Sequence, residues 1–240
     1  ISNNLANVNT TGFKKDRAVF EDLLYQNIVP AGGQVDVESE TPTGLMLGTG
    51  TRVVATEKLH AQGNIITTEN ALDLAVSGDG YFSVQQADGT IAYTRDGGFK
   101  LSAEGSLVTA GGQAILPAIT VPQNAASLTI GRDGIVTVEL ANGGGSSQIG
   151  QLQLSRFVNN SGLQPIGRNL MQQTNASGDP IVVIPGSDGA GMLMQGALEA
   201  SNVNVVEEMV NMIETQRAYE VNSKAISAAD GMLRFLNNNL

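Results

Sequence analysis

A seven-residue hydrophobic repeat at the C-terminal end constrains this chain more than any other sequence feature. Large apolar side chains recur at every seventh position, and they are Val205, Met212, Tyr219, Ile226, Leu233 and Leu240. A strict seven-residue period favours a left-handed supercoil over packing as an isolated straight helix. The pattern therefore predicts a long helix whose apolar seam packs against other helices.

The beginning of this helix is predicted by its capping residues. Asn204 can cap the helix, and Glu207 stands three residues later, which is the spacing of a capping box. Glu208 is also favourable near the positive end of the helix dipole. A helix from here to the end of the chain would be about 54 Å long, at least the diameter of a compact globule of this chain length. It cannot lie wholly within its own domain.

A second stripe on the same helix is only partly apolar. Met209, Ala229 and Leu236 belong to it, whereas Gln216, Ser223 and Asp230 interrupt it. A two-stranded zipper would be poorly filled with such a stripe, so several partner helices are favoured over one. The alternative is that the seam packs as the last helix of a globular core, and periodicity alone leaves this alternative open.

The N-terminal residues show a shorter helical pattern. Ile1, Leu5 and Val8 fall at i, i+4 and i+7, and Gly12 can adopt the left-handed conformation that ends a helix. We expect a helix that ends near residue 9 and places Leu5 and Val8 in the seam. Because the sequence starts without Met inside an apolar pattern, we expect the first turns of this helix to be missing.

The middle of the chain carries strand and turn signals. From residue 52 onward, short β-branched runs alternate with Gly-containing turns, which are typical of hairpins. Strands are predicted at residues 81–84, 91–94, 99–101, 128–130, 135–138, 152–154 and 181–184. The expected fold class is α+β, with N- and C-terminal helices forming a coiled-coil layer and a mainly antiparallel β middle domain.

Two segments link the terminal helices to this β domain. The apolar group over residues 13–24 is too short to decide between helix and extended chain. Over residues 27–50, Gly and Pro break any regular period, and the connector residues singled out are Pro30, Gly33, Pro42, Gly44 and Leu45. The predicted domains are 1–26 plus 198–240 (helical), 27–66 plus 185–197 (connector) and 67–184 (outer β domain).

Composition excludes several classes of function. The chain has 23 acidic and 13 basic side chains and a formal net charge of -10, which disfavours nucleic-acid binding. No apolar run approaches the roughly 20 residues that span a bilayer, and no secretory signal segment is visible. Cysteine is missing, so disulfides and thiolate sites are excluded. We expect neither nucleic acid nor membrane insertion.

An enzyme is the first rival hypothesis. Asp73, Asp79, Asp88 and Asp96 could in principle provide a glycosidase pair, but Gly neighbours make turns the better interpretation for the last three. His60 is the only histidine and has no Cys or second His to form a dyad or a metal site. We therefore expect no catalytic residue, no metal and no cofactor.

The two ends of the chain carry recognisable motifs. Residues 1–14 (ISNNLANVNTTGFK) and 214–222 (ETQRAYEVN) closely resemble the terminal signatures of flagellar rod and hook proteins. Residues 17–26, 48–52, 93–97 and 107–112 are similar to the distal rod member of that family. The resemblance therefore covers nearly the whole chain.

This resemblance implies a tubular helical assembly with paired terminal helices inside and the β domain outside. It implies a rigid tube that transmits motor torque to the hook and forms part of the export channel. The implied location is the basal-body rod, which crosses the periplasm to the outer membrane, after export by the flagellar type III system without a cleaved signal peptide. The implied partners are further copies of the chain, proximal rod proteins, the hook protein and the P and L ring proteins.

In the family, the irregular segment after the first helix distinguishes the straight distal rod from the bendable hook. Here that segment would be residues 27–47. A proximal rod or hook subunit is the nearest alternative, because these proteins share the terminal signatures. A secreted β-rich adhesin is more remote, because such a module has no evident use for a five-heptad helical seam.

Overall fold

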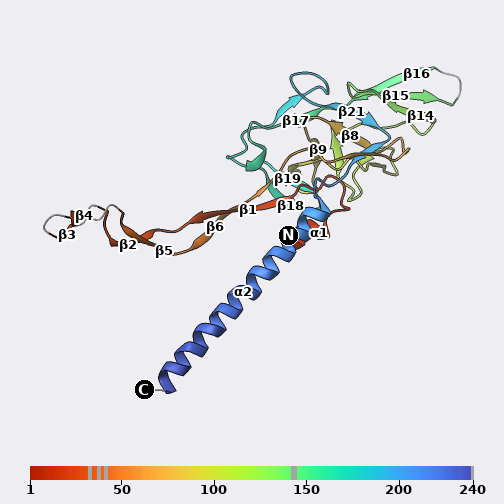
Figure 1. Cartoon of the computed structure of the whole chain (residues 1–240). Coiled ribbons are helices and arrows are strands. Elements are labelled where there is room, and N and C mark those ends of the chain that lie inside the picture. Colours follow the sequence, from red (N-terminus) through yellow and green to blue (C-terminus); the bar gives the residue numbers. More distant parts are fainter. Residues whose placement is uncertain (32–33, 37–38, 41–42, 142–144, 239–240) are drawn as a thin grey trace. The chain divides into compact units, whose positions relative to one another are not determined.

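A computed structural model describes residues 1–31, 34–36, 39–40, 43–141 and 145–238 (Figure 1). Leu240 of the predicted seam and Gly33 and Pro42 of the predicted connector lie outside these residues. The chain divides into two compact units, one formed by Ile1–Lys15 with His60–Leu240 and the other by Asp16–Leu59. Each unit is described by itself.

The larger unit consists of many short strands and one long helix. Its helices are α1 (Ser2–Ala6), the 3-10 helix η1 (Asn160–Gly162) and α2 (Val205–Asn238). Its strands are β7 (Ile65–Thr67), β8 (Leu74–Ser77), β9 (Phe82–Gln85), β10 (Ile91–Thr94), β11 (Lys100–Leu101), β12 (Leu107–Val108), β13 (Ala114–Leu116), β14 (Ala125–Ile130), β15 (Ile135–Leu140), β16 (Ser146–Gln151), β17 (Leu154–Arg156), β18 (Gln164–Gly167), β19 (Leu170–Gln172), β20 (Ile181–Val183), β21 (Met192–Gln195) and β22 (Ala197–Glu199).

Antiparallel pairing joins these strands. The largest sheet has the order β11-β12-β13-β9-β10-β19-β18, and a three-stranded sheet has the order β14-β15-β16. Smaller pairs are β17 with β20, β21 with β8 and β22 with β7. The predicted antiparallel middle domain is therefore present, and the strand prediction for residues 91–94 coincides with β10.

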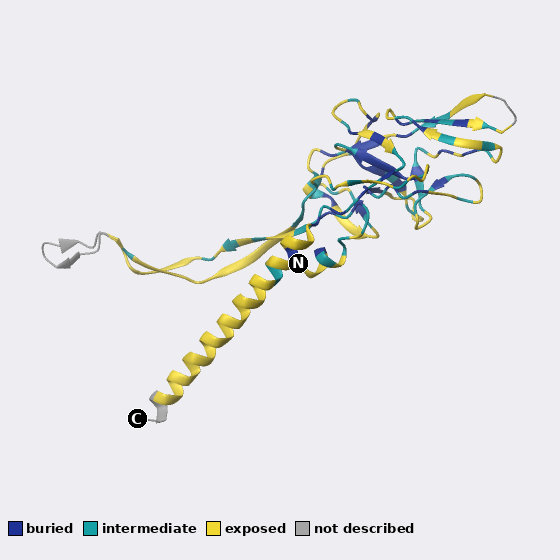
Figure 2. Cartoon of the chain, turned by 45° about the vertical axis from the view of Figure 1, so that its right-hand side comes forward, coloured by how far each residue is buried: buried dark blue, intermediate teal, exposed yellow. Residues whose placement is uncertain are grey.

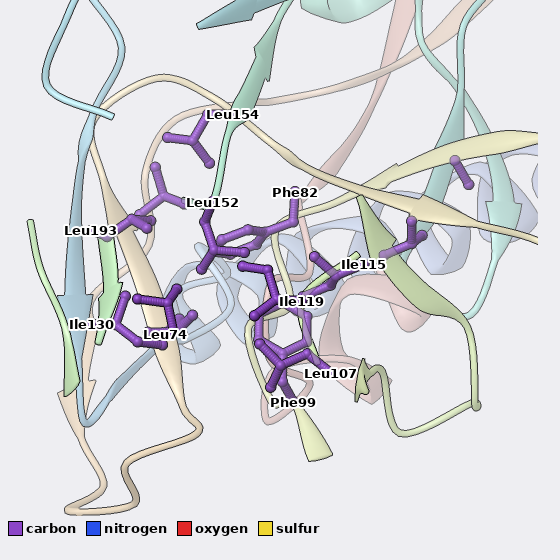
Figure 3. Packing of buried hydrophobic residues seen from close by; sticks show 14 of the residues in the cluster. Leu74, Phe82, Phe99, Leu107, Ile115, Ile119, Ile130, Leu152, Leu154 and Leu193 are labelled. Carbon is purple, nitrogen blue, oxygen red and sulfur yellow. The ribbon is translucent and has the colours of Figure 1, made fainter. Parts of the chain in front are cut away.

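A large hydrophobic core with residues from several strands holds the sheets together. The rings of Phe82 and Phe99 meet edge to face with centroids 5.0 Å apart, a favoured geometry for aromatic pairs. Leu74 from β8 and Leu193 from β21 are also buried in this core. Figure 3 shows these side chains gathered with those of neighbouring strands. The core thus combines residues that are far apart in the sequence.

Helix α2 starts where the capping residue predicts. The Asn204 side-chain oxygen accepts hydrogen bonds from the backbone N–H groups of Val206 (3.0 Å) and Glu207 (3.4 Å), so the predicted N-cap is confirmed. The helix has 34 residues and is therefore about 51 Å long. Figure 2 shows, by the colour of the ribbon, that the residues of α2 are exposed along most of its length.

The predicted fold class is wrong at the N-terminus. The chain is mostly β with one long C-terminal helix, and α1 has only five residues. A helix of about 7.5 Å cannot form a coiled-coil layer along a helix of about 51 Å. The helix stops at Ala6, earlier than predicted, because the backbone then turns between Asn7 and Gly12, which has φ +67°.

The smaller unit is built from paired strands. They are β1 (Asp16–Asp22), β2 (Tyr25–Val29), β3 (Gln34–Asp36), β4 (Ser39–Glu40), β5 (Leu45–Gly48) and β6 (Thr51–Lys58). β1 pairs with β6, β2 with β5 and β3 with β4, all antiparallel. We call this unit the ribbon. The apolar group over residues 13–24, which periodicity left undecided, contributes strand β1.

The described residues contain no helix long and apolar enough to cross a membrane. Among the same residues, no group of three or more His, Asp or Glu side chains is arranged to hold a metal ion.

Candidate assembly interface

The predicted seam of α2 lies on the surface of the chain. Tyr219 is 77% exposed, and Ile226 and Leu233 are 65% and 64% exposed. Val205 is also exposed, and Met212 is half-buried. Full burial of a large apolar side chain is more favourable than its exposure to water by about 1.5–3 kcal/mol. The seam therefore presents apolar surface that further packing would stabilise.

Other faces of α2 are apolar as well, and heptad counting identified only Met209 among the residues on them. These exposed residues are Val206, Met209, Val210, Ile213, Val221, Met232 and Phe235. A helix that is apolar on several sides is normally buried among several neighbours. For Val206, Val210 and Ile213, the signal in the sequence was the dense apolar composition of residues 205–213, which no single stripe captures. Apolar residues on several faces of α2 are consistent with packing against more than one helix.

A groove lies beside the first half of the seam. It has a volume of about 570 Å³ and is lined by Ile1 and Ser2 together with Met212, Thr215, Gln216, Tyr219 and Glu220. Two predicted seam residues, Met212 and Tyr219, therefore line one cavity. Leu5 and Val8, the other predicted seam residues, are half-buried and are not among the lining residues.

A buried charged cluster lies near the base of α2. The ammonium group of Lys14 is 2.6 Å from the carboxylate of Glu199, and the guanidinium of Arg95 is 3.4 Å from the same carboxylate. Burial lowers the pKa of Lys14, although its contact with Glu199 partly offsets the effect. The backbone N–H of Gly63 also donates to Glu199, at 2.8 Å. The cluster connects four chain segments, which contain Lys14, Gly63, Arg95 and Glu199.

His60 belongs to the surroundings of this cluster. Its Nδ1 atom lies 2.8 Å from the hydroxyl of Tyr81, and the Arg95 guanidinium stacks 5.1 Å from the centre of the Tyr81 ring. Burial raises the pKa of Tyr81 to about 12. Such contacts are typical of a structural network.

The carboxylates considered for catalysis form local structural bonds. Asp73 accepts hydrogen bonds from Thr68 and Asn70. Asp88 accepts from the hydroxyl and the backbone N–H of Thr90, and both bonds lower the pKa of this carboxyl group. Asp96 accepts from the backbone N–H of Gly98. These bonds support the turn interpretation for Asp88 and Asp96.

The ribbon exposes apolar side chains on its own surface. Phe20 and Leu24 are 64% and 88% exposed. The other exposed large apolar residues are Tyr25, Ile28, Val29, Leu45, Met46, Leu47, Val53 and Val54. Leu45, a predicted connector residue, is among them. At Gly44, a Cβ atom would lie 2.6 Å from the carbonyl oxygen of Val29, so only glycine fits this close approach.

The two faces of the β1–β6 ladder differ in chemistry. Partners directly opposite each other share a face, and alternate residues along a strand point to opposite faces. Arg17 forms an ion pair with its partner Glu57, and Arg52 forms one with its partner Glu21. Phe20 pairs with Val53 on the other face. The Phe20 face also carries the ion pair of Lys58 with Asp16 at 2.6 Å, so it combines one charged pair with exposed apolar side chains.

Three family models match the chain. "Flagella basal body rod protein" matches residues 1–14, "Flagellar hook protein FlgE/F/G D1 domain" matches residues 75–138, and "Flagellar basal body rod FlgEFG protein C-terminal" matches residues 194–239. We call strands β7 to β22 of the larger unit the β body. The β body with the exposed C-terminal helix α2 therefore has the domain organisation of the flagellar rod and hook proteins.

Curated relatives narrow this class. The chain is 55% identical to the flagellar basal-body rod protein FlgG of Buchnera aphidicola subsp. Schizaphis graminum, over 98% of this chain and 91% of the relative. It is 48% identical to the FlgG protein of Borreliella burgdorferi and 44% identical to that of Agrobacterium fabrum, over 99% and 100% of this chain and 91% and 92% of those relatives. The chain belongs to the FlgG family of flagellar basal-body rod proteins, and it is a structural component of the flagellar basal body.

Proposed function

We propose that the chain is a subunit of the distal rod that polymerises into a rigid helical tube. In this proposal the tube transmits motor torque to the hook and its lumen forms part of the export channel. The observation that carries the proposal is the exposed apolar surface of α2, because a single copy leaves this surface in water. Neighbouring copies would bury it.

Energetics favour association through α2. An isolated helix is marginally stable in water, and each large seam side chain contributes roughly 1.5–3 kcal/mol when it is fully buried. Tyr219, Ile226 and Leu233 are all largely exposed in the single chain. Several contacts of this size would offset the entropy lost on association. We propose Val205, Met212, Tyr219, Ile226, Leu233 and Leu240 as the assembly seam, with Leu5 and Val8 at its N-terminal side.

The ribbon would make the second set of contacts. A two-stranded ribbon is only marginally stable by itself, and Phe20, Leu24 and Tyr25 are exposed on it. We propose that neighbouring copies cover these side chains and thereby stiffen the rod. The connector residues Pro30, Gly33, Pro42, Gly44 and Leu45 belong to the same unit, and they would shape the part of it that sets rod straightness.

We propose no catalytic role for the chain, because His60 and the carboxylates at Asp73, Asp88 and Asp96 form structural contacts. The proposed partners are further copies of the chain, proximal rod proteins, the hook protein and the surrounding P and L rings. These partners follow from the place that a distal rod occupies in the basal body.

The seam can be tested by substituting one of its residues and examining polymer formation by electron microscopy. Ile226→Asp places a charge in the seam, and such a charge would be buried without a partner in the polymer. We expect this variant to remain monomeric under conditions in which the wild-type chain forms polymers visible by electron microscopy. Asn222→Asp adds the same charge at an exposed polar position of α2 outside the seam, and it should still polymerise.

Equal polymerisation of the Ile226→Asp variant and the Asn222→Asp control would contradict assembly through the seam. Circular dichroism and a thermal melt show whether both variants keep the β body folded, since α2 contributes little to its core. A folded Ile226→Asp chain that does not assemble is the expected result.

A further inference from the structure

The base of α2 is joined to the β body by a short segment near the N-terminus. Residues 12–15 lie beside residues 199–202, and several hydrogen bonds connect them, three of which have a backbone N–H as donor. Gly12 N–H donates to the Glu199 carbonyl (2.8 Å), Asn202 N–H donates to the Phe13 carbonyl (3.4 Å), and Lys15 N–H donates to the Asn202 side-chain oxygen (2.7 Å). The two segments are therefore paired through both backbone and side chains.

Two consecutive lysines connect this segment to different elements. Lys14 binds Glu199 at the end of β22, at 2.6 Å, and both side chains are buried. Lys15 binds Glu207 and Glu208 in the first turn of α2, at 2.7 and 2.9 Å. Adjacent residues thus bind the body on one side and the helix on the other.

Glu208 is a buried part of this junction. It is 1% exposed, and it accepts a hydrogen bond from the Asn4 amide of α1 at 3.3 Å as well as the contact from Lys15. Burial alone would raise the pKa of Glu208, but the bonds from Lys15 and Asn4 outweigh it and lower the pKa. Loss of Lys15 would leave a buried carboxylate with one weak donor.

A close backbone contact also holds residues 12–15 against the body. Gly12 has φ +67°, and a Cβ atom there would lie 2.6 Å from the backbone nitrogen of Asp96. The neighbouring Thr11 hydroxyl donates to the Asp96 carboxylate at 2.9 Å. The segment therefore lies directly on the body just before it reaches the helix.

We propose that Asn4, residues 12–15, residues 199–202, Glu207 and Glu208 form a clamp that fixes the base of α2 rigidly to the β body. Load applied to the helix then passes into the body through the clamp instead of bending the chain at residues 200–204. The clamp lies within one chain, so this inference does not rest on the proposed function. It also gives a physical role to Asn4, Gly12 and Lys14, which lie in the N-terminal segment that the rod family model matches.

The clamp can be tested by measuring the distance between helix and body. The chain has no cysteine, so Ala87→Cys in the body and Ala218→Cys on α2 accept two spin labels without other changes. Double electron–electron resonance then gives the distribution of distances between the labels. Dilution with unlabelled chain removes signals between copies, so a failure of self-assembly does not affect the result.

We expect a narrow distribution for the wild-type chain and a broader one for Lys15→Met and Glu208→Gln. Glu208→Gln removes only the Lys15–Glu208 ion pair, whereas Lys15→Met removes this pair and the Lys15–Glu207 pair, so the double variant should be no broader than Lys15→Met alone. Lys58→Met, which removes the ion pair with Asp16 in the ribbon, is the matched control and should stay narrow. Amide exchange at Gly12, Lys15 and Asn202 should accelerate about tenfold in Lys15→Met, as expected for a lost charge-assisted contact.

The proposal is overturned if the wild-type distribution is already broad, or if Lys15→Met and Glu208→Gln leave both its width and the amide exchange unchanged. Near-ultraviolet circular dichroism from the buried tyrosines confirms that each variant is folded, so that broadening is assigned to the junction.

Discussion

At the residue scale, residues 1–14 contact the rest of the chain through specific polar and backbone contacts and not through an apolar helical stripe. The buried side chain of α1 is Asn4, whereas the apolar Leu5 is only half-buried. Periodicity selects apolar residues and therefore could not find Asn4, Lys14 or Glu199, whose importance comes from contacts between residues about 200 positions apart. Sequence analysis did identify Gly12 as a residue with left-handed backbone, and its positive φ confirms this, although the C-cap of α1 is Asn7 and not Gly12.

Gly12 gives a sharp test at this scale. Gly12→Ala adds strain from the positive φ and also a clash with the Asp96 backbone, so we expect a loss of about 2–4 kcal/mol in the free energy of unfolding. Gly89→Ala is the matched control, because Gly89 has φ +83° but no atom within 4 Å of the added Cβ. It should lose only about 1 kcal/mol.

Urea unfolding of the two glycine variants beside the wild-type chain measures the difference. Equal losses for Gly12→Ala and Gly89→Ala would show that the close approach to Asp96 contributes nothing, and the description of the clamp would then be wrong at this residue.

At the element scale, sequence patterns predicted those elements whose signals are local. The cap at Asn204 and strand β10 could be predicted because capping and alternation operate within a few residues. The N-terminal helix was predicted too long because Ile1, Leu5 and Val8 match a helical period, although the chain turns after Ala6. The pairing of β1 with β6 was not predicted, because register between strands about 40 residues apart leaves no short-range signal.

Shortening the ribbon tests its role at the element scale. Replacing residues 27–46 with the two-residue turn Asn-Gly leaves the pairs Tyr25–Gly48 and Gln26–Leu47 in place, and Asn-Gly is a favourable hairpin turn. We expect rods of this variant to assemble but to bend, because exposed side chains such as Ile28 and Leu45 would no longer contact neighbouring copies. Curvature in electron micrographs measures the effect, and straight rods would contradict the proposed role of the connector.

At the scale of the whole molecule, the β body and α2 differ in how their apolar side chains are buried. The body is held by its own core, as the buried Phe82 and Leu74 show, whereas α2 leaves most of its apolar side chains in water. A polymer subunit requires a body that is stable by itself and a helix whose apolar surface is still exposed. The monomer must fold first, and assembly then buries the apolar surface of α2. Membership of the FlgG family agrees with this division.

The central claim is that this chain builds the distal rod. The most direct measurement is electron microscopy of basal bodies isolated from a strain that lacks the gene. We predict rods that stop short of the outer ring and carry no hook, and the wild-type gene supplied in trans should restore them. Complete rods without hooks would instead identify a hook subunit, and intact, motile flagella would contradict the account.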